Sequence, residues 1–263
     1  MGIREPNVAG QFYPASREEL IAELERCFHD AADAPLPLQS KKIKALIAPH
    51  AGYVYSGVVA ASAYQLLERP YRRVILLGPS HYMGFDALAL DEADGWRTPL
   101  GEVELDRETI TKLSKNKYYK VFSEAFAREH SLEVQLPFLQ KQLRSFKLVP
   151  LCCGQELAYQ LIAGTLNTVI DADTLVVASS DLSHYQPQHI AAKKDRATID
   201  AVLSRDPDKM KTDVDACGSE GIMILNELAR LNGWQPHLVD YRTSAEASGD
   251  ESAVVGYGGI VYF

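Results

Sequence analysis

The stretch Val74-Ile75-Leu76-Leu77-Gly78-Pro79-Ser80-His81 is a short apolar run that ends at glycine and proline and leads to a histidine. Two more segments share this pattern: residues 43–48 lead to His50, and residues 175–178 lead to His184. Short runs of Ile, Val and Leu bounded by Gly, Pro or Ser are typical of strands buried on both faces of a parallel sheet. Parallel strands end at one edge of the sheet, where α/β proteins bind ligands. We therefore expect the three histidines to share a site.

Strand and helix patterns alternate along the rest of the chain. A strand at 43–48, a helix at 57–67 and a strand at 73–77 form one crossover unit, and residues 147–178 form a second one. This alternation predicts an α/β fold with a mostly parallel central sheet flanked by helices. A proline- and alanine-rich link at residues 31–38 is too short to separate domains, so we expect a single domain over residues 1–263.

Several element boundaries follow from local signals. Ser16, with Glu19 three residues later, predicts a capped helix start. Ser56 is expected to open the helix at 57–67. A further helix is expected at 131–143, where Pro137 either kinks the helix or marks its first turn.

Composition excludes several classes of function. The chain has 263 residues and a formal net charge of −8, which argues against nucleic acid or an anionic membrane as the main partner. No segment is apolar for the length of a bilayer, and the first residues lack the apolar core of a secretory signal. The four cysteines lack metal-type spacing, and the adjacent Cys152 and Cys153 are expected to be core residues rather than a disulfide. We expect a cytoplasmic protein.

The loop at residues 48–57 combines a strand end, His50 and two glycines before a helix. It lacks the lysine of a phosphate-binding loop and the spacing of a dinucleotide fingerprint. Tyr53 and Tyr55 either contact a substrate or cover the edge of the sheet, and Ser80 is a further candidate substrate contact. Ser80 and Ser180 lack the flanking glycines of a nucleophile elbow, so a serine hydrolase is not expected.

Two further residues are candidates for proton transfer or metal binding. Asp181 either ligates a metal, orients a histidine, or caps the next helix. His130 precedes Ser131, a possible helix cap, and a helix N-terminus lowers the pKa of a histidine, which suits a neutral ligand or a general base. An exposed capping role for His130 is the alternative.

Five segments in this order resemble the Memo family. The segments are Asn7-Val8-Ala9-Gly10-Gln11-Phe12-Tyr13-Pro14, Pro49-His50-Ala51-Gly52-Tyr53-Val54-Tyr55-Ser56-Gly57, Gly78-Pro79-Ser80-His81, His130-Ser131-Leu132-Glu133-Val134-Gln135-Leu136-Pro137 and Ser179-Ser180-Asp181-Leu182-Ser183-His184. The resemblance implies a fold similar to the class III extradiol dioxygenases, in which two histidines and a glutamate hold Fe(II).

By this resemblance, His50 and His81 are the histidine ligands, His130 and His184 fill the acid and base positions, and Asp181 lies beside the pocket. Animal members of the family carry a cysteine after the strand that contains Tyr241, and an ungapped count places it at Ala247. The neighbouring Glu246 can bind metal, so we expect His50, His81 and Glu246 to form a two-histidine, one-carboxylate face suited to Fe(II). The alternative is that Glu246 is a solvated loop residue.

The resemblance leaves two classes of function open. The first is a non-haem iron oxidoreductase of dioxygenase type that binds Fe(II) or another divalent metal and a small molecule. The second is a non-catalytic adaptor that uses the same pocket for a peptide or a protein. Related bacterial and archaeal proteins are named together with AMMECR1-like and radical-SAM proteins, which suggests these as partners.

Overall fold

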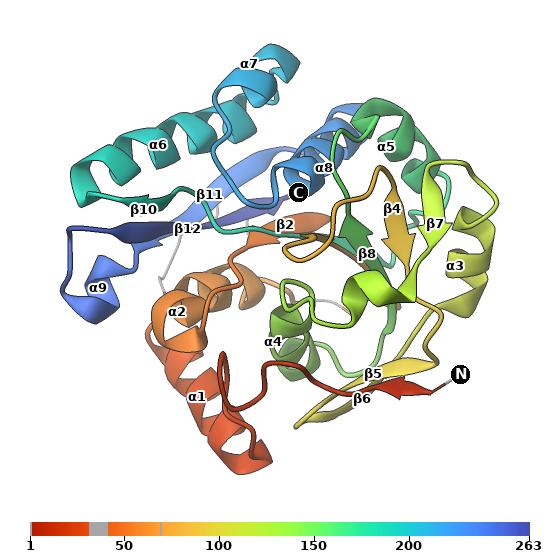
Figure 1. Cartoon of the computed structure of the whole chain (residues 1–263), viewed down its shortest axis with the longest axis horizontal. Coiled ribbons are helices and arrows are strands. Elements are labelled where there is room, and N and C mark those ends of the chain that lie inside the picture. Colours follow the sequence, from red (N-terminus) through yellow and green to blue (C-terminus); the bar gives the residue numbers. More distant parts are fainter. Residues whose placement is uncertain (1, 32–41, 69) are drawn as a thin grey trace.

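The computed structural model describes residues 2–31, 42–68 and 70–263. The link predicted at residues 31–38 lies outside these ranges, except for Ala31. A central sheet runs through the molecule with helices above and below it, as Figure 1 shows. The expected α/β class is confirmed.

Within the described residues, the main sheet contains nine strands. They are β2 (Ala45–Ala48), β3 (Arg73–Pro79), β4 (Leu88–Leu90), β7 (Tyr119–Val121), β8 (Lys147–Cys153), β9 (Thr174–Ser179), β10 (His184–Gln186), β11 (Pro236–Thr243) and β12 (Val254–Tyr262). A second sheet contains β1 (Ile3–Arg4), β5 (Gly95–Thr98) and β6 (Gly101–Glu104).

The helices connect these strands. They are α1 (Arg17–His29), α2 (Tyr53–Tyr64), α3 (Arg107–Leu113), α4 (Leu136–Gln142), α5 (Tyr159–Asn167), α6 (Gln188–Ser204), α7 (Pro207–Thr212), α8 (Ser219–Asn232) and α9 (Ala245–Ser248), with 3₁₀ turns η1 (Ser123–Phe126) and η2 (Glu133–Gln135). None of the helices in the described part of the chain has the length and apolar character needed to cross a membrane.

The centre of the main sheet is parallel, and an antiparallel pairing lies on each side of it. Strands β2, β9, β3 and β8 lie side by side in this order and run in one direction. Strand β12 pairs antiparallel with β2, and β4 pairs antiparallel with β8, so the sheet is mixed rather than purely parallel. Because β2, β9 and β3 are parallel neighbours, their carboxyl ends meet at one edge.

Both faces of the central strands are covered. Helix α2 packs against β2, β11 and β12, and α1 and α4 pack against α2. On the opposite face α8 packs against β3 and β9, and α5 packs against α8 (Figure 1). Every residue of β2 and β9 is buried, as their Ile-, Val-, Leu- and Ala-rich sequences require.

The helix starts show where local signals succeed and fail. Ser16 caps α1 as predicted, with its hydroxyl accepting a hydrogen bond from the Glu19 amide at 3.2 Å. Helix α2 begins at Tyr53, four residues before the predicted position, because the Phe12 carbonyl accepts the Tyr53 amide at 2.8 Å. A cap supplied by a distant segment has no local signature.

One further prediction was changed by the structure, and another was confirmed. The single helix expected at 131–143 is a 3₁₀ turn followed by α4, with Pro137 in the first turn, where its missing amide hydrogen costs nothing. Cys152 and Cys153 are buried and free, which confirms their prediction as core residues.

Candidate metal centre

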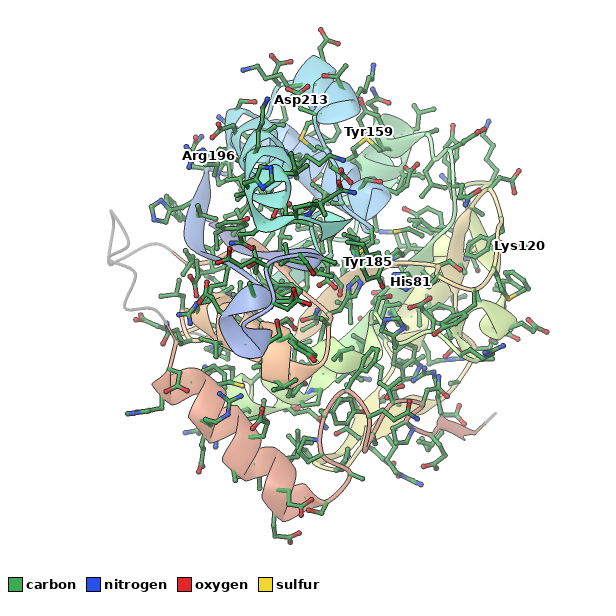
Figure 2. The ribbon with its side chains drawn as sticks, turned by 60° about the vertical axis from the view of Figure 1, so that its left-hand side comes forward. His81, Lys120, Tyr159, Tyr185, Arg196 and Asp213 are labelled. Carbon is green, nitrogen blue, oxygen red and sulfur yellow. The ribbon has the colours of Figure 1, made fainter. Side chains whose placement is uncertain are left out.

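Three histidines converge at the carboxyl edge of the central strands. His50 follows β2, His81 follows β3, and His130 lies in the loop before η2. Each offers a ring nitrogen, and these three nitrogens lie within 4.8 Å of one another. His50 is buried, His130 is half-buried and His81 is exposed, so the group is open to solvent on the side of His81, which Figure 2 labels.

Hydrogen bonds fix the orientation of the His50 ring. Its Nδ1 lies 2.9 Å from the Ser179 hydroxyl oxygen, and that hydroxyl donates its only hydrogen to the Ser131 carbonyl at 2.6 Å. Ser179 therefore accepts a hydrogen bond from His50, and the proton of the neutral ring must lie on Nδ1. The lone pair on Nε2 is left for a metal ion.

Gln135 strengthens this assignment. Its Nε2 donates to the Ser179 hydroxyl at 2.7 Å and to the Pro49 carbonyl at 2.9 Å. The Pro49 carbonyl can only accept a hydrogen bond, which excludes the flipped amide, and the Tyr64 hydroxyl donates to Oε1 of the same amide at 2.9 Å. Gln135 therefore donates one hydrogen bond to the Ser179 oxygen, and Nδ1 of His50 donates the other.

A buried carboxylate orients His81. Glu129 is 1% exposed, and its Oε1 lies 2.9 Å from Nδ1 of His81. Its Oε2 accepts the His81 backbone amide at 2.6 Å. Burial alone would raise the pKa of Glu129, but the hydrogen bonds from His81 and Ser131 lower it to about 2. The ionised carboxylate accepts a hydrogen bond from Nδ1–H of His81. The lone pair on Nε2 of His81 is therefore also available for a metal.

His130 is held differently. Its Nδ1 is buried and has no hydrogen-bond partner among the described residues; Oε1 of Glu129 lies 3.6 Å away. The ring stacks on His81 with centroids 4.7 Å apart, and Phe12 packs against it edge-on, also at 4.7 Å. Packing, rather than a hydrogen bond, therefore sets the direction of this ring.

The environment keeps two of these histidines neutral. Burial, with the nearby His81, lowers the pKa of His50 to about 3, and burial, with the nearby His50, lowers the pKa of His130 to about 4. Metal binding requires the neutral imidazole. These two rings are therefore in the ligand-competent state at neutral pH.

Cys217, which sequence reasoning did not select, also lies at the site. Its Sγ is 3.2 Å from Nε2 of His50, and the adjacent Gly218 lies so close to Ser179 that a Cβ would be 2.5 Å from the Ser179 carbonyl oxygen. Burial, with the nearby Asp181, raises the pKa of the Cys217 thiol to about 12. The local sequence signal for this residue is the Cys-Gly pair directly before α8. The spacing between pairs of cysteines, which indicates disulfides and zinc sites, does not reveal a single cysteine of this kind.

The predicted proton-transfer residues lie around this group. Oδ1 of Asp181 accepts the His50 backbone amide at 2.7 Å, and burial raises the pKa of this carboxyl. His184 begins β10 and is half-buried, and a positive charge at its position would lower the pKa of both His50 and Asp181. His130, predicted as an acid or base, belongs instead to the group of ring nitrogens that could hold a metal.

Glu246 is not brought to the histidines. It lies in α9 with 56% of its side chain exposed, and its nearest charged partner is Arg242 at 3.7 Å. Within the described residues the group around His50 and His81 includes His130 and not Glu246. The expected metal-binding face of His50, His81 and Glu246 is therefore wrong. The ungapped count from Tyr241 placed the third ligand in α9, which is exposed to solvent. The cysteine that lies near His50 is Cys217.

The predicted substrate contacts have different environments. Tyr53 is 2% exposed, and its hydroxyl donates to the Val134 carbonyl at 2.6 Å, so it is a packing residue and its assignment as a substrate contact is corrected. Tyr55 is 45% exposed. The Ser80 hydroxyl donates to the Met83 carbonyl at 2.8 Å and closes the turn after His81.

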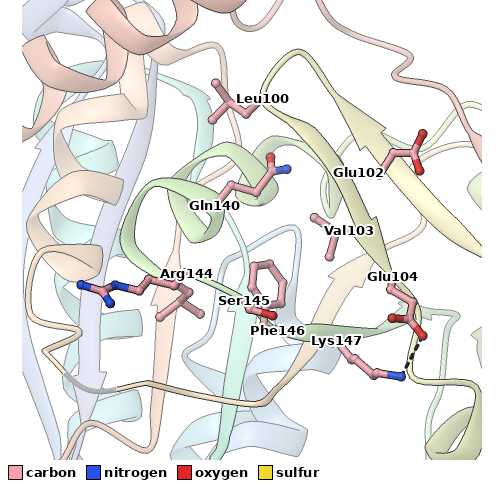
Figure 3. A pocket seen from close by; sticks show the side chains of 10 residues that line it. Leu100, Glu102, Val103, Glu104, Gln140, Arg144, Ser145, Phe146 and Lys147 are labelled. Atoms are coloured by element: carbon pink, nitrogen blue, oxygen red, sulfur yellow. Dashed lines mark hydrogen bonds and ion pairs between the residues drawn. The ribbon is translucent and has the colours of Figure 1, made fainter.

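A pocket of about 380 Å³ lies away from the histidines, beside β6 and the turn that leads into β8 (Figure 3). Its charged groups include Lys147, which forms an ion pair with Glu104 at 2.7 Å. Since Lys147 begins β8, this pocket lies at the amino end of that strand.

The donor set at the carboxyl edge fits a first-row transition metal. Metal–nitrogen bonds of about 2.1 Å place coordinating nitrogens about 3 to 4 Å apart, so ring nitrogens within 4.8 Å need only a small closure. Imidazole suits Fe, Zn, Cu and Ni, whereas Mg²⁺ and Ca²⁺ prefer oxygen. The Nδ1 atom of His130 is buried and has no hydrogen-bond partner among the described residues, which also fits a missing bond to a metal.

The fold and site together define an α/β protein with a three-histidine group that could hold a metal. A profile of the family described as Memo-like protein matches residues 4–261. The chain is 40% identical to a MEMO1 family protein of Methanococcoides burtonii, over 98% of this chain and 99% of that relative. A MEMO1 family protein of Aquifex aeolicus is 36% identical over the full length of both chains. The chain belongs to the Memo family, as its motifs indicated.

Proposed function

We propose that this protein binds one divalent first-row metal ion, with Fe(II) as the leading candidate, through His50, His81 and His130. The observation that carries the proposal is the assignment of ring protons: Nδ1 of His50 and of His81 are each occupied by a hydrogen bond. His50 and His81 therefore each offer Nε2. One ring nitrogen from each of the three histidines lies within 4.8 Å of the other two. Cys217 is the candidate fourth ligand, since its Sγ lies 3.2 Å from Nε2 of His50.

The proposed chemistry is oxidation of a small substrate with dioxygen. A bound Fe(II) would supply a Lewis acid and a one-electron donor with coordination positions open on the solvent side. Asp181 holds the His50 loop through the backbone amide, and Glu129 holds His81. His184 is the half-buried histidine of this edge outside the proposed ligand set, so we assign it the proton transfer.

A second candidate function is an adaptor that binds a peptide or protein at the same edge. Exposed aromatic rings favour it: Tyr82 follows His81 and is 52% exposed, and Tyr185 follows His184 and is 77% exposed. Exposed tyrosines beside a functional site are typical of binding surfaces.

The deciding experiment measures metal content after anaerobic purification and loading with Fe(II). The native chain is expected to retain close to one iron per chain and the His81→Ala variant to lose it. His189→Ala, at an exposed position of α6, is the matched control and should retain iron. Absence of iron from the native chain would contradict the proposal and favour the adaptor.

Two further variants test the remaining ligands. Cys217→Ser in the Co(II)-loaded protein should remove the sulfur-to-cobalt charge-transfer absorption, and Glu246→Ala should leave the spectrum and the affinity unchanged. A loss of affinity in Glu246→Ala would restore the carboxylate ligand suggested by the sequence. An unchanged spectrum in Cys217→Ser would remove the thiol from the ligand set.

A further inference from the structure

The loop at residues 7–13 has no role in the proposed chemistry, yet it is hydrogen-bonded to the buried carboxylate of Glu133, three residues after His130. Glu133 is 0% exposed and accepts four hydrogen bonds from this N-terminal region. The donors are Arg4 Nη1 at 3.0 Å, the Asn7 amide at 2.8 Å, the Val8 amide at 3.0 Å and the Tyr13 hydroxyl at 2.7 Å. A fully buried carboxylate with this many donors fixes the loop rigidly.

The loop at residues 7–13 places Phe12 in contact with the segment that follows His50 and with His130. The Phe12 carbonyl accepts the Tyr53 amide at 2.8 Å and so joins the start of α2, three residues after His50. The Phe12 ring meets the His130 ring at 88° with a centroid distance of 4.7 Å. One residue therefore contacts the His50 segment through its backbone and His130 through its side chain.

The three histidines differ in what orients them. Ser179 holds His50 and Glu129 holds His81 through hydrogen bonds at Nδ1, whereas Nδ1 of His130 has no such partner in the described residues. The His130 ring stacks on His81 and meets Phe12 edge-on, each with centroids 4.7 Å apart, while Tyr82 lies farther away at 6.3 Å. Among the described residues, Phe12 therefore makes the closest ring contact to His130 from outside the histidine group.

We propose that Phe12 is the positioning residue for His130, and that Glu133 acts through it by fastening the loop at residues 7–13. This inference rests on the proposed metal site. Without the aromatic ring at position 12, His130 is free to turn away from His50 and His81, and the metal loses one nitrogen ligand to water. The site would then hold a metal ion with lower affinity, with a water oxygen in place of one imidazole nitrogen.

The test uses Co(II), whose d–d absorption bands shift to longer wavelength when a water oxygen replaces an imidazole nitrogen. Phe12→Leu is expected to lower Co(II) affinity about tenfold, the lower end of the effect of losing a residue that supports a ligand, and to shift the d–d bands to longer wavelength. Phe12→Tyr keeps the ring and should restore both. Phe28→Leu is the matched control, because Phe28 makes a similar edge-on contact with Phe138, at 5.8 Å, away from the histidines.

Glu133→Gln tests the second half of the proposal and should show the same spectral change if it folds. If it does not fold, Phe12→Leu alone decides. Native affinity and spectrum in Phe12→Leu, with metal bound by the native chain, would overturn the inference and leave the metal site intact. No Co(II) binding by the native chain would instead overturn the proposed function.

Discussion

The Nδ1 atom of His81 and the Oε1 atom of Glu129 lie 2.9 Å apart, and the same carboxylate oxygen accepts the backbone amide of His130 at 2.9 Å. One buried carboxylate therefore holds two of the three histidines of the site, one through its ring and the other through its backbone. An aspartate or glutamate behind a ligating histidine fixes the ring and makes it a better donor. Glu129 is the residue through which His81 and His130 are coupled.

Replacing this carboxylate should weaken the metal site. In Glu129→Gln the charge is lost, and an amide NH₂ group faces donors that need an acceptor. We expect metal affinity to fall about 10- to 100-fold, measured by competition with a chromophoric chelator. Glu124→Gln, at an exposed position of η1, is the control. Equal affinities for the two variants would show that Glu129 does not support the ligand.

The metal-free protein should lose stability as the pH falls from about 6.5 to 4. The pKa of His50 is lowered to about 3 and that of His130 to about 4, whereas in the unfolded chain both lie near 6.5. In this window the unfolded state binds protons that the folded state does not, so acid favours unfolding. Between pH 7 and pH 5 each group should cost about 2 kcal/mol.

Urea denaturation with a chelator present at the two pH values measures this loss. His130→Asn removes one of the two titrating groups, so its loss of stability should be about half that of the native chain. A variant with the full native pH dependence would show that His130 is not buried in its neutral form.

Ser179→Ala should destabilise the folded chain. The change leaves Nδ1 of buried His50 and the amide of Gln135 without their acceptor. A buried donor left unpaired costs about 1–3 kcal/mol, and urea denaturation at pH 7 measures the difference. Ser114→Ala removes a half-buried hydroxyl at the end of α3 and should change stability by less than about 0.5 kcal/mol. Equal effects would mean that the Ser179 hydrogen bonds contribute nothing beyond those of a peripheral serine.

Tyr185 should be replaceable by asparagine with a gain in stability. It has a φ of 56° and lies at a bulge between His184 and Gln186, while 77% of its surface is exposed. The left-handed conformation costs most residues about 1 kcal/mol and asparagine less. Thermal denaturation should therefore give a higher midpoint for Tyr185→Asn than for Tyr185→Phe, which retains the strain. The same midpoint for both variants would show that the left-handed backbone conformation at position 185 does not destabilise the protein.

The sequence predicted the central strands and the meeting of His50 and His81, because buried parallel strands have a local apolar signature and end at a common edge. It could not predict the residues that orient the rings. Glu129 and Ser179 contact His81 and His50 from segments far away in the chain, and nothing near them in the sequence marks those contacts. The third ligand was wrongly placed at Glu246 for a similar reason. An ungapped count along the chain assumes a loop length, and the fold alone determines which loop residue reaches the histidines.

The order of strands also sets when the site can exist during synthesis. Strand β9 lies between β2 and β3, the strands that lead to His50 and His81, although its residues follow β3 by about 100 positions and β2 by about 130. A nascent chain therefore exposes all three histidines before it contains the strand that spaces them. If the proposed metal site is correct, an ion can enter the completed geometry only after Ser179 has left the ribosome, and metal loading would follow folding rather than accompany its early intermediates.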